Sequence, residues 1–125
     1  MVELKHYYLT KIVEDQEWHD KDYIIEEAVF NSLIEFWEEE DGEEYIRQFF
    51  ENTDPYISDE YRDYYREVHK VLTLAYDWAK IRHSEKEKYN YYSFSDEMLS
   101  LNNKIKEADT EHLLNIIKYR KHLWV

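Results

Sequence analysis

The scarcity of glycine and proline constrains this chain more than any other feature of its sequence. Its 125 residues contain one glycine, Gly42, and one proline, Pro55. Tight β-hairpins, glycine-rich phosphate loops and antiparallel sandwiches depend on turn residues with positive φ, a conformation that glycine supplies. We therefore predict an all-α fold, in which helices are joined by a few short connections.

The composition is that of a folded domain in spite of a net charge of −13. Apolar residues make up 43% and aromatic residues 18%, more than a disordered acidic chain carries. The length suits a single core, so residues 1–125 are predicted to form one α-helical domain. The absence of cysteine excludes disulfides, thiol catalysis and cysteine-ligated zinc. No apolar run is long enough to span a membrane and no signal-peptide core is visible, so we expect a cytoplasmic protein without membrane contact.

Apolar periodicity predicts helices over residues 22–41, 43–52, 58–88 and 95–123. The first is a central amphipathic helix and the second is short. The third and fourth are expected to be two long antiparallel helices of a bundle, although 95–123 could also form two shorter ones. An N-terminal extended arm precedes them. Gly42 is expected to end the first helix in a left-handed conformation.

The charge is concentrated in the first half of the chain. Residues 14–67 hold 20 Asp and Glu against 4 Lys and Arg, a net charge of −16, whereas residues 68–125 have a net charge of +2. A field of this sign repels nucleic acid and anionic membranes, and it attracts basic surfaces. Tyr61, Tyr64 and Tyr65 follow the spacing of a helix core, so they do not indicate a stacking surface for nucleic acid.

The stretch LIEFWEEEDGEEY, residues 33–45, contains seven acids and no basic residue. Like charges four residues apart destabilise a helix by a few tenths of a kcal/mol each. A solvated helix face is one interpretation of this stretch. The other is an acidic face selected to dock on a basic partner, formed by Glu27, Glu35, Glu38, Glu39, Glu40, Asp41, Glu43 and Glu44.

The sequence offers little support for metal binding or catalysis. Glu3–His6 and Asp109–His112 have the Glu-x-x-His type of spacing used in di-metal bundles, but the ligands for a pair are not present. No cofactor motif occurs, so no metal or cofactor is expected. Glu26 is the one acid placed toward an apolar face, and we expect it to emerge into water. Arg82 and His83 lie at the edge of an apolar stripe and are expected to extend to solvent.

Three functions remain open, and the first is favoured. It is binding without enzymatic activity, with the acidic face imitating nucleic acid on the basic surface of a host protein. A nucleic-acid-binding host protein is one candidate for this partner. The second is a structural role through self-association, for instance as a homodimer, by way of Leu74, Ile81, Trp124 and Val125. The third is a metal-dependent enzyme centred on Glu26 and a histidine.

Three stretches of the chain together resemble a group of known sequences. They are LIEFWEEEDGEEYIRQFF, VLTLAYDWAKIRHSEKEK and DTEHLLNIIKYRKHLWV. Their pattern is similar to that of small acidic proteins of tailed bacteriophages, which are uncharacterised. The resemblance covers about two-thirds of the chain by pattern and implies a viral origin and expression in a host cytoplasm. It carries no functional residue over to this sequence.

Overall fold

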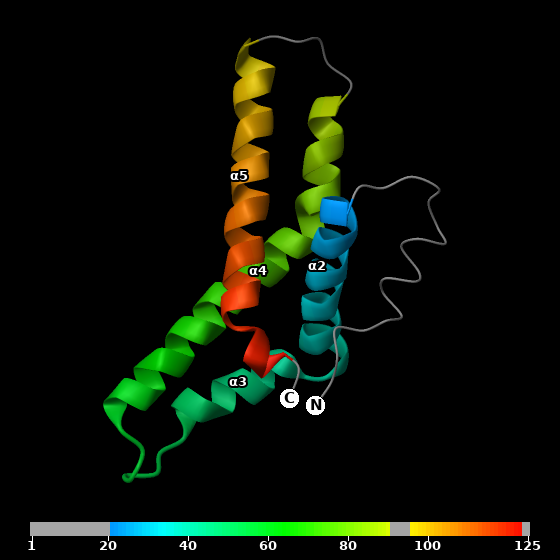
Figure 1. The fold of residues 1–125 in the computed structure, drawn as a ribbon. Coiled ribbons are helices and arrows are strands. Elements are labelled where there is room, and N and C mark those ends of the chain that lie inside the picture. Colours follow the sequence, from blue (N-terminus) through cyan, green and yellow to red (C-terminus); the bar gives the residue numbers. More distant parts are fainter. Residues whose placement is uncertain (1–20, 91–95, 124–125) are drawn as a thin grey trace.

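The computed structural model describes residues 21–90 and 96–123, which are helical almost throughout (Figure 1). The helices are α2 (Lys21–Glu39), α3 (Gly42–Glu51), α4 (Asp59–Asn90) and α5 (Asp96–Lys118), followed by the 3₁₀ helix η1 (Arg120–His122). No strand occurs within these ranges, so the predicted all-α class is confirmed for them. The predicted N-terminal arm and the Glu3–His6 pair lie outside the described residues. None of the helices described combines the length and apolar character needed to cross a bilayer.

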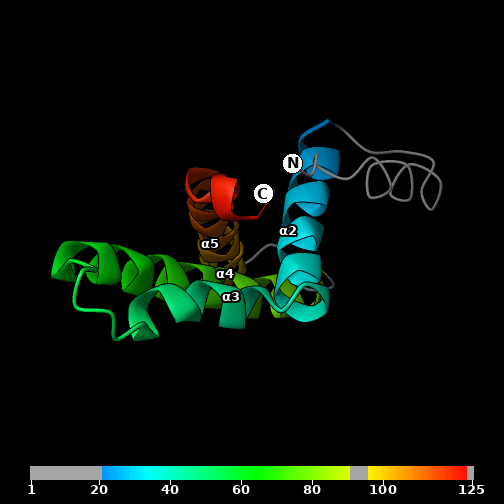
Figure 2. The same cartoon turned by 90° about the horizontal axis from the view of Figure 1, so that it is seen from below.

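The long helix α4 organises the others, because it contacts α2, α3 and α5. Its ribbon changes direction partway along its length (Figure 1). The second part of α4 runs beside α5 in the opposite direction. The first part of α4 begins near the end of α3 and diverges from α5. Seen from below, α3 runs alongside this first part, and α2 and α5 stand on the same side of the pair (Figure 2).

The core lies where α2, α4 and α5 meet. Buried apolar residues recur at helical spacing on α2, α4 and α5, because side chains three, four or seven residues apart share one face, and α3 adds one. They are Val29, Phe30, Leu33 and Phe36 on α2, Ile46 on α3, Val68, Leu72, Ala75 and Ala79 on α4, and Ile105 and Ile116 on α5. Ile25 continues the predicted stripe of α2 toward its N-terminus, but it is half exposed.

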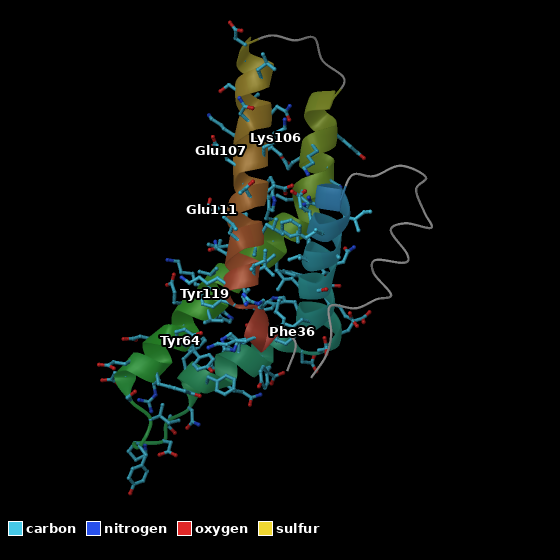
Figure 3. The ribbon with its side chains drawn as sticks, in the orientation of Figure 1. Phe36, Tyr64, Lys106, Glu107, Glu111 and Tyr119 are labelled. Atoms are coloured by element: carbon cyan, nitrogen blue, oxygen red, sulfur yellow. The ribbon has the colours of Figure 1, made fainter. Side chains whose placement is uncertain are left out.

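The C-terminal part of the last helix differs from its predicted course. The α-helix ends at Lys118, and the chain turns through Tyr119 into η1 instead of continuing to residue 123. Tyr119 packs edge-on against Tyr64 of α4, with ring centroids 6.3 Å apart (Figure 3). Nε2 of His122 lies 3.1 Å from the hydroxyl of Tyr64. Burial lowers the pKa of His122, and the nearby positive charge of Lys121 lowers it further. These contacts hold the chain end on the first part of α4.

The bend between α2 and α3 does not use Gly42 as predicted. Asp41 adopts the left-handed conformation, with φ 53° and ψ 39°, and Gly42 is the first residue of α3. Asp is one of the few residues with a side chain that tolerate this region. Gly42 is needed for a different reason, because a Cβ atom there would lie 2.6 Å from the carbonyl oxygen of Phe36 and closer still to its ring. The ring of Phe36 points into this bend (Figure 3).

The Gly42→Ala variant is therefore expected to be less stable by about 1–3 kcal/mol, the usual cost of overpacking. Neither the Phe36 backbone nor its buried ring can move away without disturbing the core. Urea unfolding followed by circular dichroism would measure the loss. An Ala substitution at the exposed neighbour Glu44 serves as the control. Equal stability of the two variants would show that the bend relaxes around the added methyl group.

Candidate functional site

The acidic run predicted as a binding face lies at the junction of α2 and α3. α2 ends at Glu39 and α3 begins at Gly42, so Glu40 and Asp41 form the connection. The left-handed backbone of Asp41 turns the chain within these two residues. The acids between Glu38 and Glu44 consequently project from a bend, not from one straight helix.

Glu38, at the start of this bend, is paired within the chain. Its carboxylate accepts a hydrogen bond from the hydroxyl of Tyr76 and one of 2.9 Å from Nζ of Lys80, both on α4. The hydrogen bonds from Tyr76 and Lys80 lower the pKa of Glu38, and the same contact raises the pKa of Tyr76 to about 12. Glu38 therefore joins α2 to α4, and its charge is partly compensated.

Glu43, at the other end of the bend, is also engaged. Its Oε1 lies 3.1 Å from Nε2 of His69 on α4 and 3.4 Å from Nη1 of Arg47, one turn further along α3. The ring of His69 packs against Phe50 and Trp37, which places it between α2 and α3. The carboxylate of Glu43 thus points toward α4 and is half-buried.

Four acids of the run remain fully available to solvent. Glu39, Glu40, Asp41 and Glu44 are all exposed, and their carboxylates make no hydrogen bond or ion pair with any part of the chain that the structure describes. We call these four residues the acidic bend. It presents four carboxylates within six positions, and no cation of residues 21–90 or 96–123 is paired with them.

Two residues predicted on the acidic face are not fully exposed. Glu27 was expected to be exposed, but it is buried with 6% of its surface accessible, so this prediction is wrong. α2 is covered by both α4 and α5 at this level, and its polar side therefore meets the interior. Glu35 is half-buried, so it is less available to a partner than the acidic bend.

Glu27 belongs to a group of charges at the meeting point of three helices. Its centre is Arg82 of α4, which is 1% exposed, whereas the sequence predicted that it would extend to solvent. Nε and Nη2 of Arg82 donate to the two carboxylate oxygens of Asp109 on α5, at 2.9 and 2.7 Å. Nη1 donates to Glu27 on α2. The guanidinium also lies over the ring of Phe30, 4.3 Å from its centroid.

Further donors complete the coordination of the two carboxylates. Asp109 also accepts hydrogen bonds of 2.7 Å from Nε1 of Trp78 and 2.6 Å from Nζ of Lys86. Nε2 of His83, whose side chain is 55% exposed, lies 2.9 Å from Oε2 of Glu27. We call Glu27, Arg82, His83, Lys86 and Asp109 the buried charge cluster. Two acids face three basic side chains in it.

The electrostatics of the buried charge cluster favour the ionised forms of both acids. Burial on its own would raise the pKa of Asp109, but hydrogen bonds from Arg82, Lys86 and Trp78 outweigh it and bring the pKa to about 2. Burial likewise opposes ionisation of Glu27, and the bonds from His83 and Arg82 reverse that effect and lower its pKa. A general acid requires the opposite change, a pKa raised toward neutrality. The arrangement therefore ties three helices together through charge, and neither Glu27 nor Asp109 has the raised pKa of a general acid.

The sequence contains a signal for this cluster that becomes visible only when two helices are compared with each other. Arg82 follows Ala75 and Ala79 at spacings of seven and three, and Asp109 lies four residues after Ile105. Charged residues of opposite sign thus occupy core positions on two helices. Because buried charges in proteins are generally paired, an ion pair between Arg82 and Asp109 could have been predicted from the sequence.

The remaining predicted residues have varied surroundings. Glu26 is half-buried, with Oε2 3.6 Å from Nη2 of Arg82, so it lies at the edge of the cluster instead of entering water freely. His112 stacks on Trp78 with centroids 5.9 Å apart, and its Nδ1 is buried without a hydrogen-bond partner in the described structure. Leu74 and Ile81 are 52% and 46% exposed on α4. Trp124 and Val125 lie outside the described residues.

No protein-family model, curated protein or solved structure matches this chain.

Proposed function

We propose that this helical bundle is a binding protein without catalytic activity, and that the acidic bend docks on a basic surface of a host protein. One observation carries the proposal. Glu38 and Glu43 are paired with cations of the same chain, Lys80 and Arg47, whereas Glu39, Glu40, Asp41 and Glu44 stay exposed and uncompensated among the described residues. Surface carboxylates kept close together without counter-charges raise the local field and attract cationic partners.

The position of the acidic bend supports rigid presentation of these charges. Glu38, just before it, and Glu43, between Asp41 and Glu44, are fastened to α4, and Gly42 packs against Phe36. Carboxylates that project from a fixed bend can imitate the phosphates of a nucleic acid backbone, and they require little ordering when the partner binds. A nucleic-acid-binding protein is one partner with the complementary surface. The resemblance to small acidic phage proteins would place that partner in the cytoplasm of a bacterial host.

Removal of four charges tests the proposal. The variant with Glu39→Gln, Glu40→Gln, Asp41→Asn and Glu44→Gln should bind the partner about fourfold to several hundredfold more weakly, because it loses four exposed ion pairs that contribute about 0.2–1 kcal/mol each. Its thermal unfolding should be unchanged, since these side chains are exposed. The measurement is a pull-down of the tagged protein from host lysate at low and high salt, followed by titration of the protein that is retained. The captured partner should be lost as salt rises, because salt screens exposed charges.

A matched variant removes the same charge elsewhere. Asp77→Asn, Glu97→Gln, Glu107→Gln and Glu111→Gln change four exposed acids of α4 and α5. This control should keep the affinity of the unmodified protein within a few-fold. If both quadruple variants weaken binding equally, net charge alone is responsible and docking of the acidic bend is rejected.

Self-association is the second candidate function, and the exposure of two apolar residues favours it. Leu74 and Ile81 lie seven residues apart on α4 and therefore on one face of the helix, and about half of each side chain is exposed. If this face pairs with a second copy, Leu74→Glu together with Ile81→Glu should convert an oligomer to a monomer in sedimentation. A protein that is monomeric before the change would exclude this role.

A further inference from the structure

The connection between α3 and α4 carries an aromatic side chain that the fold does not use. Tyr56 is 96% exposed, whereas the exposed tyrosines Tyr45, Tyr61 and Tyr64 are 39–40% accessible and pack against other rings. The connection projects beyond the ends of both helices, at the extremity of the molecule farthest from the start of α5 (Figure 1). A large aromatic ring left entirely in water contributes nothing to the core.

The backbone that presents Tyr56 is nevertheless well ordered by hydrogen bonds. Residues 54–57 form a β-turn in which the amide of Ile57 donates to the carbonyl of Asp54 at 3.1 Å. Pro55 occupies the second position, where its fixed φ suits such a turn. The amide of Tyr56 itself donates to Oδ1 of Asp54 at 2.9 Å. Tyr56 therefore occupies the third position of a closed turn.

A side chain from α4 fixes this turn to the rest of the protein. Arg62 donates from Nε to the carbonyl of Asn52 at 3.0 Å and from Nη2 to the carbonyl of Asp54 at 2.7 Å. Ser58 also caps the first turn of α4, since its Oγ accepts the amide of Tyr61 at 3.1 Å. The entry and exit of the connection are both held, so the Tyr56 ring is presented from a fixed base.

The surroundings of Tyr56 are acidic. Glu51, Asp54, Asp59 and Glu60 are all exposed within five residues of it along the chain. Arg62, the nearest cation in the sequence, donates to backbone carbonyls, lies 3.6 Å from Asp59, and has a side chain that is only 17% exposed. Arg47 likewise lies 3.6 Å from Glu51. Both of these pairs are solvent-exposed on the acid's side, at 98% for Asp59 and 61% for Glu51, so their carboxylates remain accessible to a partner. Glu44, Gln48 and Glu51 share one exposed polar face of α3, which lies between the acidic bend and the turn.

We propose that Tyr56 is an anchor that stacks against an arginine side chain of the basic partner, with the surrounding carboxylates pairing with further cations. The inference rests on the proposed function and adds the chemistry of the partner, a protein surface that carries arginine. The face of an aromatic ring attracts cations, arginine most often, and carboxylates beside the ring strengthen that preference. Tyrosine is also enriched at binding hot spots, and a fixed turn reduces the ordering that binding requires.

The test uses a fluorescently labelled nona-arginine peptide as the probe and measures its dissociation constant by anisotropy at low salt. Tyr56→Leu keeps an apolar side chain of moderate size but removes the ring, and it should weaken binding about two- to fivefold, the range of an exposed cation–π contact. Tyr56→Phe keeps the ring and should bind as the unmodified protein does. Thr53→Ala, an exposed neutral change in the same connection, is the control. Nona-lysine should show a smaller effect of Tyr56→Leu, because arginine stacks better on rings.

Each outcome of this test decides the inference. Equal binding by Tyr56→Leu and the unmodified protein overturns it, as does an equal loss in Tyr56→Phe, which would assign the effect to the hydroxyl group. Absence of peptide binding by the unmodified protein rejects it as well. The quadruple variant of the acidic bend is measured in parallel. If that variant binds normally while Tyr56→Leu is weakened, the role of the acidic bend fails and the anchor remains; the reverse result retains the acidic bend alone.

Discussion

Replacement of Arg82 by alanine is expected to lower the free energy of unfolding by about 3–5 kcal/mol, the cost of removing one partner from a buried ion pair. Arg82 is 1% exposed and donates to Asp109 on α5 and to Glu27 on α2. Without it, both carboxylates stay inside the protein, with fewer donors to offset their lost hydration. The guanidinium contact with Phe30 and the packing of the aliphatic stem are lost as well. Chemical denaturation at neutral pH measures this change.

Two further substitutions separate charge from geometry in this effect. Arg82→Lys retains the positive charge but cannot reproduce the paired bonds from Nε and Nη2 to Asp109, so an intermediate loss is expected. A variant with Arg82→Met, Glu27→Gln and Asp109→Leu removes the main buried charges together and should recover part of the stability, since apolar replacements of buried ion pairs are often neutral or stabilising.

A surface arginine provides the control for Arg82. Arg66 pairs with Asp63 at 2.7 Å, but the two side chains are 54% and 71% exposed. Exposed pairs of this kind contribute about 0–1 kcal/mol, so Arg66→Ala should be mild. Similar losses in Arg66→Ala and Arg82→Ala would contradict a central role for the buried charge cluster.

Acidification should weaken the same contacts, with a loss of about 2 kcal/mol from Asp109 between pH 4 and pH 2. The pKa of Asp109 lies at about 2 in the folded protein and at 3.8 as the ordinary value. A carboxylate whose pKa is lowered by folding stabilises the native state above the unfolded pKa, and this contribution disappears as the pH falls through the folded pKa. The pKa of Glu27 is also lowered, so its contribution has the same sign.

The Asp109→Asn variant isolates this contribution from the titration of the other acids. The chain has a net charge of −13, so protonation of its acids at low pH relieves the repulsion between them. This effect is nearly the same in the unmodified protein and in Asp109→Asn. The difference in unfolding free energy between the unmodified protein and Asp109→Asn should therefore decrease toward pH 2, where Asp109 becomes protonated. A difference that stays constant from pH 6 to pH 2 would show that Asp109 is not the titrating group.

The helices themselves were accessible to sequence analysis, because their signals are local. The periodic apolar residues of α4 and the single glycine predict long helices without knowledge of any contact between them. The observed α2 and α4 begin and end within two residues of the predicted bounds. α5 is the exception, since its last turn is replaced by η1, where packing of Tyr119 and His122 on Tyr64 competes with continued helix.

The surface was predicted less well than the helices. The exposure of Glu39, Glu40, Asp41 and Glu44 agrees with the predicted acidic face, because a dense run of acids cannot be buried. Glu27 was assigned to the same face from its position on a single helix. A helical wheel assumes that only the apolar side of a helix is buried. Because α2 is covered by both α4 and α5, some of its polar positions also face the interior. Tyr56 did not stand out either, since exposure of one tyrosine among 13 depends on the turn that carries it.

Local composition and periodicity were thus sufficient to specify an all-α chain with its charge concentrated in one half. The pairing of Arg82 with Glu27 and Asp109, across 55 and 27 residues of sequence, was decided by tertiary structure. The same holds for the separation of compensated acids such as Glu38 from the uncompensated acidic bend. The physical reason is that helix formation depends on neighbours within a few residues, whereas the ionic environment of a carboxylate depends on which distant side chains folding brings within about 4 Å of it.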